Sequence, residues 1–144
     1  MKATLKPVLT HRFSYTVPEN KTVAFLYPEA LDLQTRPKVF ATGFMVGLME
    51  WGCVQLMRPH LDPGEGSLGV PIDVSHAAAT PPGLTITLDA RCTMVEGRRL
   101  SFEVKAHDGI DLIGEDRHER FVVTWNRLNT KVAEKVMAAQ KATV

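Results

Sequence analysis

One carboxylate stands in the most hydrophobic segment of this chain. Residues 40–57 are apolar almost all round a helix, and Glu50 is the only charged residue among them. A helix of this kind is normally buried. Burying an ionised carboxylate without hydrogen-bond or ion-pair partners costs free energy. Such a group is therefore paired, protonated or part of a functional site. Glu50 is therefore the first candidate for chemistry.

Two further residues are candidate companions of Glu50. Thr42 lies eight residues earlier, which places it about 80° round a helix and about 12 Å along it, so the two share roughly one face without touching. His76 has the strand parity of Ile72 and Val74, and it points toward the helix if that face packs there. A histidine and a carboxylate that converge in an apolar environment can act as an acid–base pair.

Each of these signals has a structural alternative. A threonine near a helix start is commonly a cap, and a lone histidine at a strand end is more often structural. The start of the helix is itself a candidate for chemistry, because its unpaired N–H groups and positive dipole end would stabilise the oxyanion of an acyl carbonyl.

Two other positions have readings that the sequence leaves open. Residues 64–69 match G-x-G-x-x-G, but they follow a helix and precede a strand, so the dinucleotide-binding context is inverted and a flexible connection is predicted. Gly69 would still let a ligand approach its backbone N–H. Arg120 has the parity opposite to Phe121 and Val123. It is either solvated on the sheet or in contact with a phosphate or carbonyl at a dimer cleft.

The surrounding pattern predicts an α+β protein. We expect a strand at 12–17, then a proline-punctuated segment at 19–39 with a helical turn near 27–31. An apolar helix follows at about 39–61. After it we expect four strands, at about 69–78, 84–94, 100–106 and 111–125, and a polar helix at 129–141. A helix that is apolar all round must be wrapped, and a curved antiparallel sheet can wrap it. This predicts a hotdog fold, an antiparallel β-sheet around one long central α-helix, as a single domain over residues 1–144. Its sheet edges would be exposed, which favours a homodimer or a larger assembly.

The composition of the chain limits the classes of binding partner and the sites that can be expected. The formal net charge of +1 gives no basic face for nucleic acid. The apolar run is too short to span a membrane, and the first residues have no apolar signal region, so we expect a cytoplasmic protein. Cys53 and Cys92 lack metal or redox spacing and are expected to be buried, reduced thiols. The five histidines show no ligand spacing with acids or cysteines, so no metal site is predicted.

Several contiguous runs resemble the fluoroacetyl-CoA thioesterase family and its hotdog relatives. They are residues 40–51, residues 63–69, and His76 followed by 79–85, with 95–101 and 106–109 extending the match from about residue 10 to about residue 135. The resemblance implies a homodimeric enzyme that cleaves short acyl-CoA thioesters and needs no cofactor, since CoA is part of the substrate. It also implies that Thr42, Glu50 and His76 form the catalytic set and that Gly69 and Arg120 lie at the substrate.

The chain departs from that family before the helix. The family enzyme specific for fluoroacetyl-CoA has aromatic lid residues there, and the corresponding positions here are Leu33 and Arg36. This difference affects the expected preference for an acyl group more than the expected thioester hydrolysis. A cationic Arg36 near the mouth either admits a polar or anionic acyl group or is simply solvated.

The sequence leaves the role of Glu50 open between nucleophile and general base. It also leaves alternatives to hydrolysis. One is a hotdog enoyl-CoA hydratase, which would need an Asp/His pair on a loop into the helix, a spacing not found here. Another is a non-catalytic acyl-CoA binding protein. A purely structural domain would have no evident use for a carboxylate in its core.

Overall fold

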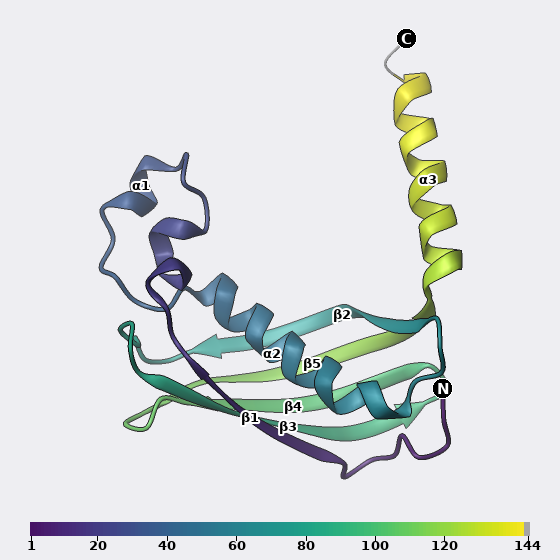
Figure 1. Cartoon of the computed structure of the whole chain (residues 1–144), viewed down its shortest axis with the longest axis horizontal. Helices are drawn as coiled ribbons and strands as arrows, with labels where there is room; N and C mark the ends of the chain where they lie inside the picture. The colour runs from purple at the N-terminus through teal and green to yellow at the C-terminus, as the bar shows by residue number, and fades with distance from the viewer. Residues whose placement is uncertain (143–144) are drawn as a thin grey trace.

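The computed structural model describes residues 1–142, which form one sheet and three α-helices (Figure 1). In chain order the elements are β1 (Thr10–Thr16), the 3-10 turns η1 (Glu19–Lys21) and η2 (Val23–Phe25), α1 (Leu31–Gln34), α2 (Thr42–Met57), η3 (Arg58–His60), β2 (Glu65–His76), β3 (Thr85–Glu96), β4 (Arg99–His107), β5 (Leu112–Thr124) and α3 (Trp125–Ala142).

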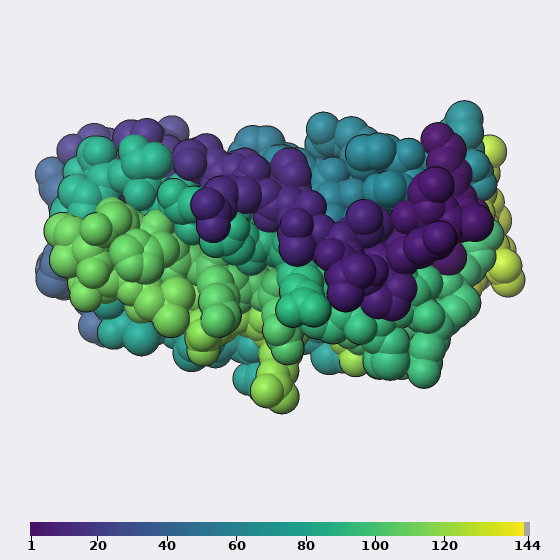
Figure 2. Space-filling model, turned by 90° about the horizontal axis from the view of Figure 1, so that it is seen from below, coloured from purple at the N-terminus to yellow at the C-terminus, as the bar shows by residue number. Residues whose placement is uncertain are grey.

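The sheet is antiparallel throughout and α2 lies across one of its faces (Figure 1). Its strand order is β1-β3-β4-β5-β2, so β1 and β2 are the two edges. Alternate residues of the strands face α2 and form the core with it; the buried members include Ile86, Leu88, Ala90, Leu100, Phe102, Val104, Met45, Met49 and Met57. The N-terminal segment runs along the β1 side of the molecule (Figure 2).

Helix α2 is shorter than the helix predicted at about 39–61. The chain before it is extended, since Phe40 N–H donates to Thr80 O at 2.7 Å and Ala41 N–H donates to Lys21 O at 3.1 Å. At the other end Pro59 has no N–H to continue the helix, and a 3-10 turn follows. The two hydrogen bonds tie the N-terminal end of α2 to the β2–β3 connection and to η1.

The expectation that α2 is buried on every side is wrong for this chain. Seven residues of the helix are buried, but Trp51 on the opposite side is 47% exposed. The Glu50 side chain is 38% exposed, and Gly43 and Gly47 are exposed as well. The sheet covers only one side of the helix, so Glu50 lies at the edge of an open apolar face.

A β-bulge in β2 decides which residues face α2. The register with β5 shifts between Gly69 and Ile72, where Val70 and Pro71 together oppose one residue. Pro71 cannot donate to the ladder, which suits an edge strand and a bulge. Because the extra residue reverses the alternation, Gly69 and His76 lie on the same face of the sheet despite their opposite parity.

Helix α3 continues directly from β5 and leaves the sheet (Figure 1). It starts four residues before the predicted helix at 129–141, and none of its described residues is buried. No helix within residues 1–142 is long and apolar enough to cross a membrane. Cys53 and Cys92 are free and buried, as expected. Burial raises the pKa of both thiols, which makes them unreactive.

Candidate active site

Thr42 and His76 form a pair at the start of α2. The Thr42 hydroxyl lies 2.7 Å from Nδ1 of His76. Thr42 is the first residue of the helix, and the residue that caps the helix is Ala41. The hydroxyl is therefore engaged with the histidine and is not a cap. The prediction that His76 points toward the helix is confirmed.

The second ring nitrogen of His76, Nε2, is buried and has no hydrogen-bond partner among residues 1–142. Burial lowers the pKa of His76 below its ordinary value, while the backbone of Ala78 acts in the opposite direction. A pocket of about 280 Å³ adjoins the pair and is lined by Val23, Val39 and Phe40 as well. A neutral imidazole beside such a pocket can accept a proton or orient water.

The lowered pKa of His76 predicts the acid side of the pH–rate profile. Because the pKa of His76 is depressed in the folded protein, half of the imidazole is protonated only at a pH below about 6.5, the ordinary histidine value. We expect the acid-side decline of kcat/KM to be centred below that value. The measurement is kcat/KM against pH for wild type and His76→Gln. A wild-type decline centred above the ordinary histidine pKa would contradict this assignment, as would an unchanged profile in the variant.

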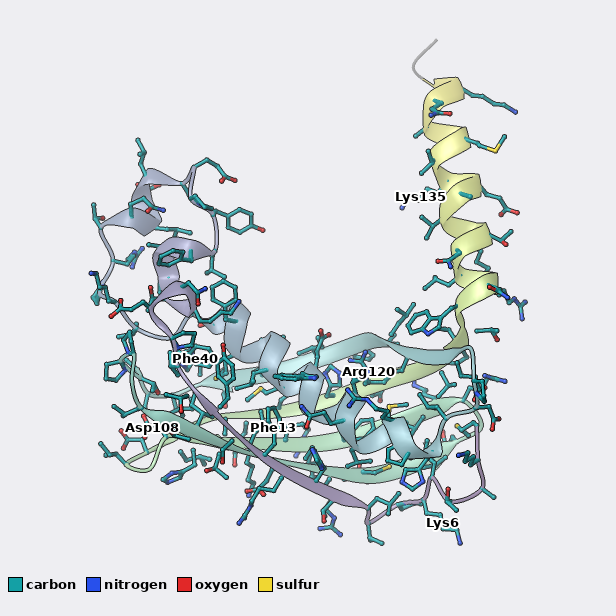
Figure 3. The ribbon with its side chains drawn as sticks, viewed as in Figure 1. Lys6, Phe13, Phe40, Asp108, Arg120 and Lys135 are labelled. Atoms are coloured by element: carbon teal, nitrogen blue, oxygen red, sulfur yellow. The ribbon has the colours of Figure 1, made fainter. Side chains whose placement is uncertain are left out.

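Glu50 belongs to a second cluster farther along α2. Its Oε1 atom lies 3.7 Å from Nη1 of Arg120. Arg120 is only 5% exposed and lies between the sheet and α2 (Figure 3). Its Nε donates to Ser67 Oγ at 2.8 Å and its Nη2 to Ser67 O at 3.0 Å. Burial lowers the pKa of Arg120, and the nearby Glu50 raises it. The alternative of a solvated Arg120 is therefore wrong.

Gly69 provides the space for the Glu50 carboxylate. A Cβ atom at this position would lie 2.6 Å from Glu50 Oε1 and 3.5 Å from Arg120 Nη1. The backbone of β2 thus passes directly beneath the carboxylate.

Gly69→Ala is expected to displace the carboxylate and lower kcat. An added methyl group would overlap Glu50 Oε1, and a displacement of about 1 Å can reduce a rate about 10²-fold. The fold should persist, because Gly69 lies in an exposed part of an edge strand. Turnover of an acyl-CoA ester and the thermal unfolding midpoint would be compared with those of wild type. Unchanged kcat in a folded Gly69→Ala protein would show that the placement of Glu50 over Gly69 has no catalytic importance.

Within one chain the two clusters remain apart. Thr42 and His76 are at the first turn of α2, and Glu50 is two turns later, about 12 Å along the axis. Within residues 1–142 the ion-pair partner of Glu50 is Arg120, not His76. The structure thus brings Thr42 to His76 and Glu50 to Gly69 and Arg120, but it does not join the two sets.

Sequence reasoning missed two buried polar residues beside Arg120. Asp116 and His118 lie on the inner face of β5, whereas Phe121 of the opposite parity is 44% exposed. The neighbouring strand, β4, contained the information that would have placed them inside. β4 has a clearly apolar face, and its Val104 pairs with Asp116 in the antiparallel register. Paired residues share a face, so the β4–β5 hairpin register would have placed these polar side chains inside.

A family model for fluoroacetyl-CoA-specific thioesterases matches residues 17–126 of this chain. The chain belongs to this family. The fluoroacetyl-CoA thioesterase of Streptantibioticus cattleyicolor is 58% identical to it over 129 residues, which are 90% of this chain and 91% of that protein. A variant of the fluoroacetyl-CoA thioesterase FlK, solved with fluoroacetate and CoA, is 54% identical with a TM-score of 0.84, covering 86% of this chain and 99% of that one.

The fold comparison extends beyond this family. A hot-dog-like protein from Thermanaerovibrio acidaminovorans superposes with a TM-score of 0.76 at 24% identity, covering 90% of this chain and 91% of that one. The predicted hotdog fold and thioesterase family are confirmed. As a member of the fluoroacetyl-CoA-specific thioesterase family, the protein is a thioester hydrolase.

The segment that corresponds to the family lid lies beyond the N-terminal end of α2 (Figure 1). Leu33 is in α1, which Gln34 ties to η2 through a 2.9 Å hydrogen bond from Nε2 to Ala24 O. Arg36 follows α1 and is exposed. Neither Leu33 nor Arg36 lines the pocket at the Thr42–His76 pair. In this family member, their substrate-binding role stays a prediction.

Proposed function

We propose that this protein hydrolyses a short acyl-CoA thioester to the free acid and CoA, with Glu50 as nucleophile or general base assisted by Thr42 and His76. The observation that carries the proposal is the Glu50 carboxylate, which is held over Gly69 at the open face of α2. A thiolate leaving group has a pKa of about 8.5, far below that of an amine. A carboxylate is therefore sufficient for this reaction without a serine nucleophile.

Two routes use the same residues. In the first, a Glu50 oxygen attacks the thioester carbonyl carbon, the C–S bond breaks to release CoA thiolate, and water then cleaves the mixed anhydride. In the second, Glu50 removes a proton from a water molecule whose oxygen attacks the carbonyl. Backbone N–H groups at Gly69 or at the start of α2 would stabilise the oxyanion. His76, held by Thr42, would activate water or protonate the departing sulfur.

We further propose that the protein works as a homodimer and that each site combines two chains. Two exposed surfaces support this: the open face of α2 with Trp51, and the β2 edge with Val70, which is 55% exposed. A two-fold axis near Val46, midway between positions 42 and 50, would run the two helices antiparallel. The Thr42–His76 pair of one chain would then face the partner's Glu50 and close the gap between the two clusters.

The proposal also covers the preferred acyl group and the cellular location of the protein. The pocket beside the Thr42–His76 pair is small, which suits a short acyl chain. Leu33 and Arg36 are proposed to select that chain, with Arg36 favouring a polar or anionic group. The protein is proposed to act in the cytoplasm, with acyl-CoA as a substrate and with neither nucleic acid nor membrane as a partner.

The test is thiol release from a panel of CoA esters by wild type and Glu50→Ala. The panel contains acetyl, fluoroacetyl, malonyl and medium-chain esters. Rapid release that disappears in the variant would support a Glu50-dependent thioesterase, and the best ester would show what Leu33 and Arg36 select. If the wild-type protein binds CoA esters but does not hydrolyse them, the proposal is contradicted and a role as a binding protein is favoured.

A further inference from the structure

A line of buried ionisable residues runs beneath Glu50 along β5. Asp116, His118 and Arg120 are 3%, 1% and 5% exposed, and all three face α2 in a core that is otherwise largely apolar. Burial of such groups is costly unless they bind one another or serve a function. Arg120 is the last of the three along β5, and its guanidinium faces Glu50.

The hydrogen-bond roles in this line follow from chemistry. A guanidinium can only donate, so His118 Nε2, 2.9 Å from Arg120 Nη1, must be the acceptor. A neutral imidazole that accepts at Nε2 has its proton on Nδ1. That Nδ1 atom lies 3.3 Å from Asp116 Oδ2, although the geometry of the two groups is not that of a hydrogen bond. A carboxyl oxygen at this distance attracts a proton on Nδ1, which is the tautomer that Arg120 requires.

Asp116 has no other evident use within the described residues. Its side chain is fully buried, and neither of its oxygens has a hydrogen-bond partner among residues 1–142. Within residues 1–142 its one ion-pair contact is with the His118 ring. A carboxyl oxygen placed there attracts the Nδ1 proton and disfavours a flipped ring, which would turn an N–H toward Arg120.

His118 completes the restraint on the Arg120 side chain. Ser67 accepts from two nitrogens of the guanidinium, and His118 accepts from the third. The same Nη1 that binds His118 faces Glu50 Oε1 at 3.7 Å. The position of the Glu50 carboxylate thus depends on an arginine whose third nitrogen is fixed by His118.

We propose that His118, oriented by Asp116, is a positioning residue that holds Arg120 against the Glu50 carboxylate during thioester hydrolysis. This inference rests on the proposed function of Glu50 and adds two residues to it. His118 acts through Arg120 and does not touch the substrate. Its loss should therefore lower kcat while leaving KM nearly unchanged.

The first test compares His118→Leu with His118→Gln. Leucine removes the acceptor, and we expect kcat to fall by about 10-fold or more, because the carboxylate is no longer held in place. Glutamine keeps an acceptor oxygen near the position of Nε2 and should recover most of the rate, with KM within roughly threefold of wild type in both variants. In an Arg120→Gln background, His118→Leu should have no additional effect, because the residue through which it acts is already absent.

The second test does not depend on activity. Nitrogen-15 NMR of the labelled wild-type protein should show His118 protonated at Nδ1 and unprotonated at Nε2, and Asp116→Asn should weaken this preference. Ile113→Ala is the matched control, since Ile113 is equally buried on β5 but makes no polar contact with Arg120. It should reduce stability without reducing kcat.

The outcomes separate this inference from the function on which it rests. Wild-type kcat in His118→Leu, additive loss in the Arg120→Gln background, or a proton on Nε2 would overturn the role of His118. If Glu50→Gln is inactive while His118→Leu is fully active, only the inference fails. If Glu50→Gln keeps the full rate, the proposed function fails as well.

Discussion

Glu50→Gln is expected to reduce kcat/KM for a short acyl-CoA ester by roughly 10³-fold, the contribution typical of a positioned acid–base group. The amide keeps the size of the side chain but can neither attack the carbonyl nor accept a proton from water. The fold should be retained, because Glu50 is partly exposed on the open face of α2. Thiol release and thermal unfolding would be measured together. A folded variant with more than a tenth of the wild-type rate would contradict the assignment.

A matched carboxylate elsewhere in the chain controls for charge removal. Glu115 is exposed on the outer face of β5, away from α2, so Glu115→Gln should hydrolyse the ester at the wild-type rate. Single-turnover hydrolysis in oxygen-18 water and adduct trapping together distinguish the two routes. Label in the Glu50 side chain, or an acyl-Glu50 adduct trapped in Thr42→Ala or His76→Ala, would support direct attack. Label only in the product acid, with no adduct trapped in either variant, would support general-base catalysis.

Mixed dimers of two inactive variants are expected to regain hydrolysis if each site combines two chains. One chain carries Glu50→Gln and its partner carries His76→Ala. One site then combines the intact Thr42–His76 pair of the first chain with the partner's Glu50, and the other site carries both changes. We expect roughly half of the wild-type rate per mixed dimer, from one intact site of two. Differently tagged chains, co-expressed and purified through both tags, would be assayed against each homodimer.

The alternative arrangement gives the opposite result. If Thr42, His76 and Glu50 of a single chain formed the site, each site in the mixed dimer would carry one change and the rate would stay at the level of the inactive homodimers. Mixed dimers that pair Glu50→Gln with Glu50→Ala provide the control, because no arrangement of those chains restores the carboxylate. A protein that remains monomeric at assay concentration would also contradict the intersubunit site.

The local pattern of residues determined most of the architecture. The 40–57 apolar run forms α2, and the alternation of apolar residues through Ile86, Leu88 and Ala90 gives a strand with one buried face. These features depend on the periods of a helix and a strand, which a sequence displays directly. Glu50 was recognisable for the same reason, since a single charge in an apolar run is visible without coordinates. The family resemblance added Thr42, His76, Gly69 and Arg120 as site residues.

Only the tertiary structure decided how these residues meet. The bulge at Val70 and Pro71 puts Gly69 and His76 on one face, which strict alternation forbids. The β4–β5 pairing turns Arg120 inward, with Asp116 and His118 beneath it. The sheet covers one side of α2 and leaves Glu50 at an open face. Register, burial and cover depend on contacts between residues far apart in the chain, so no local period specifies them.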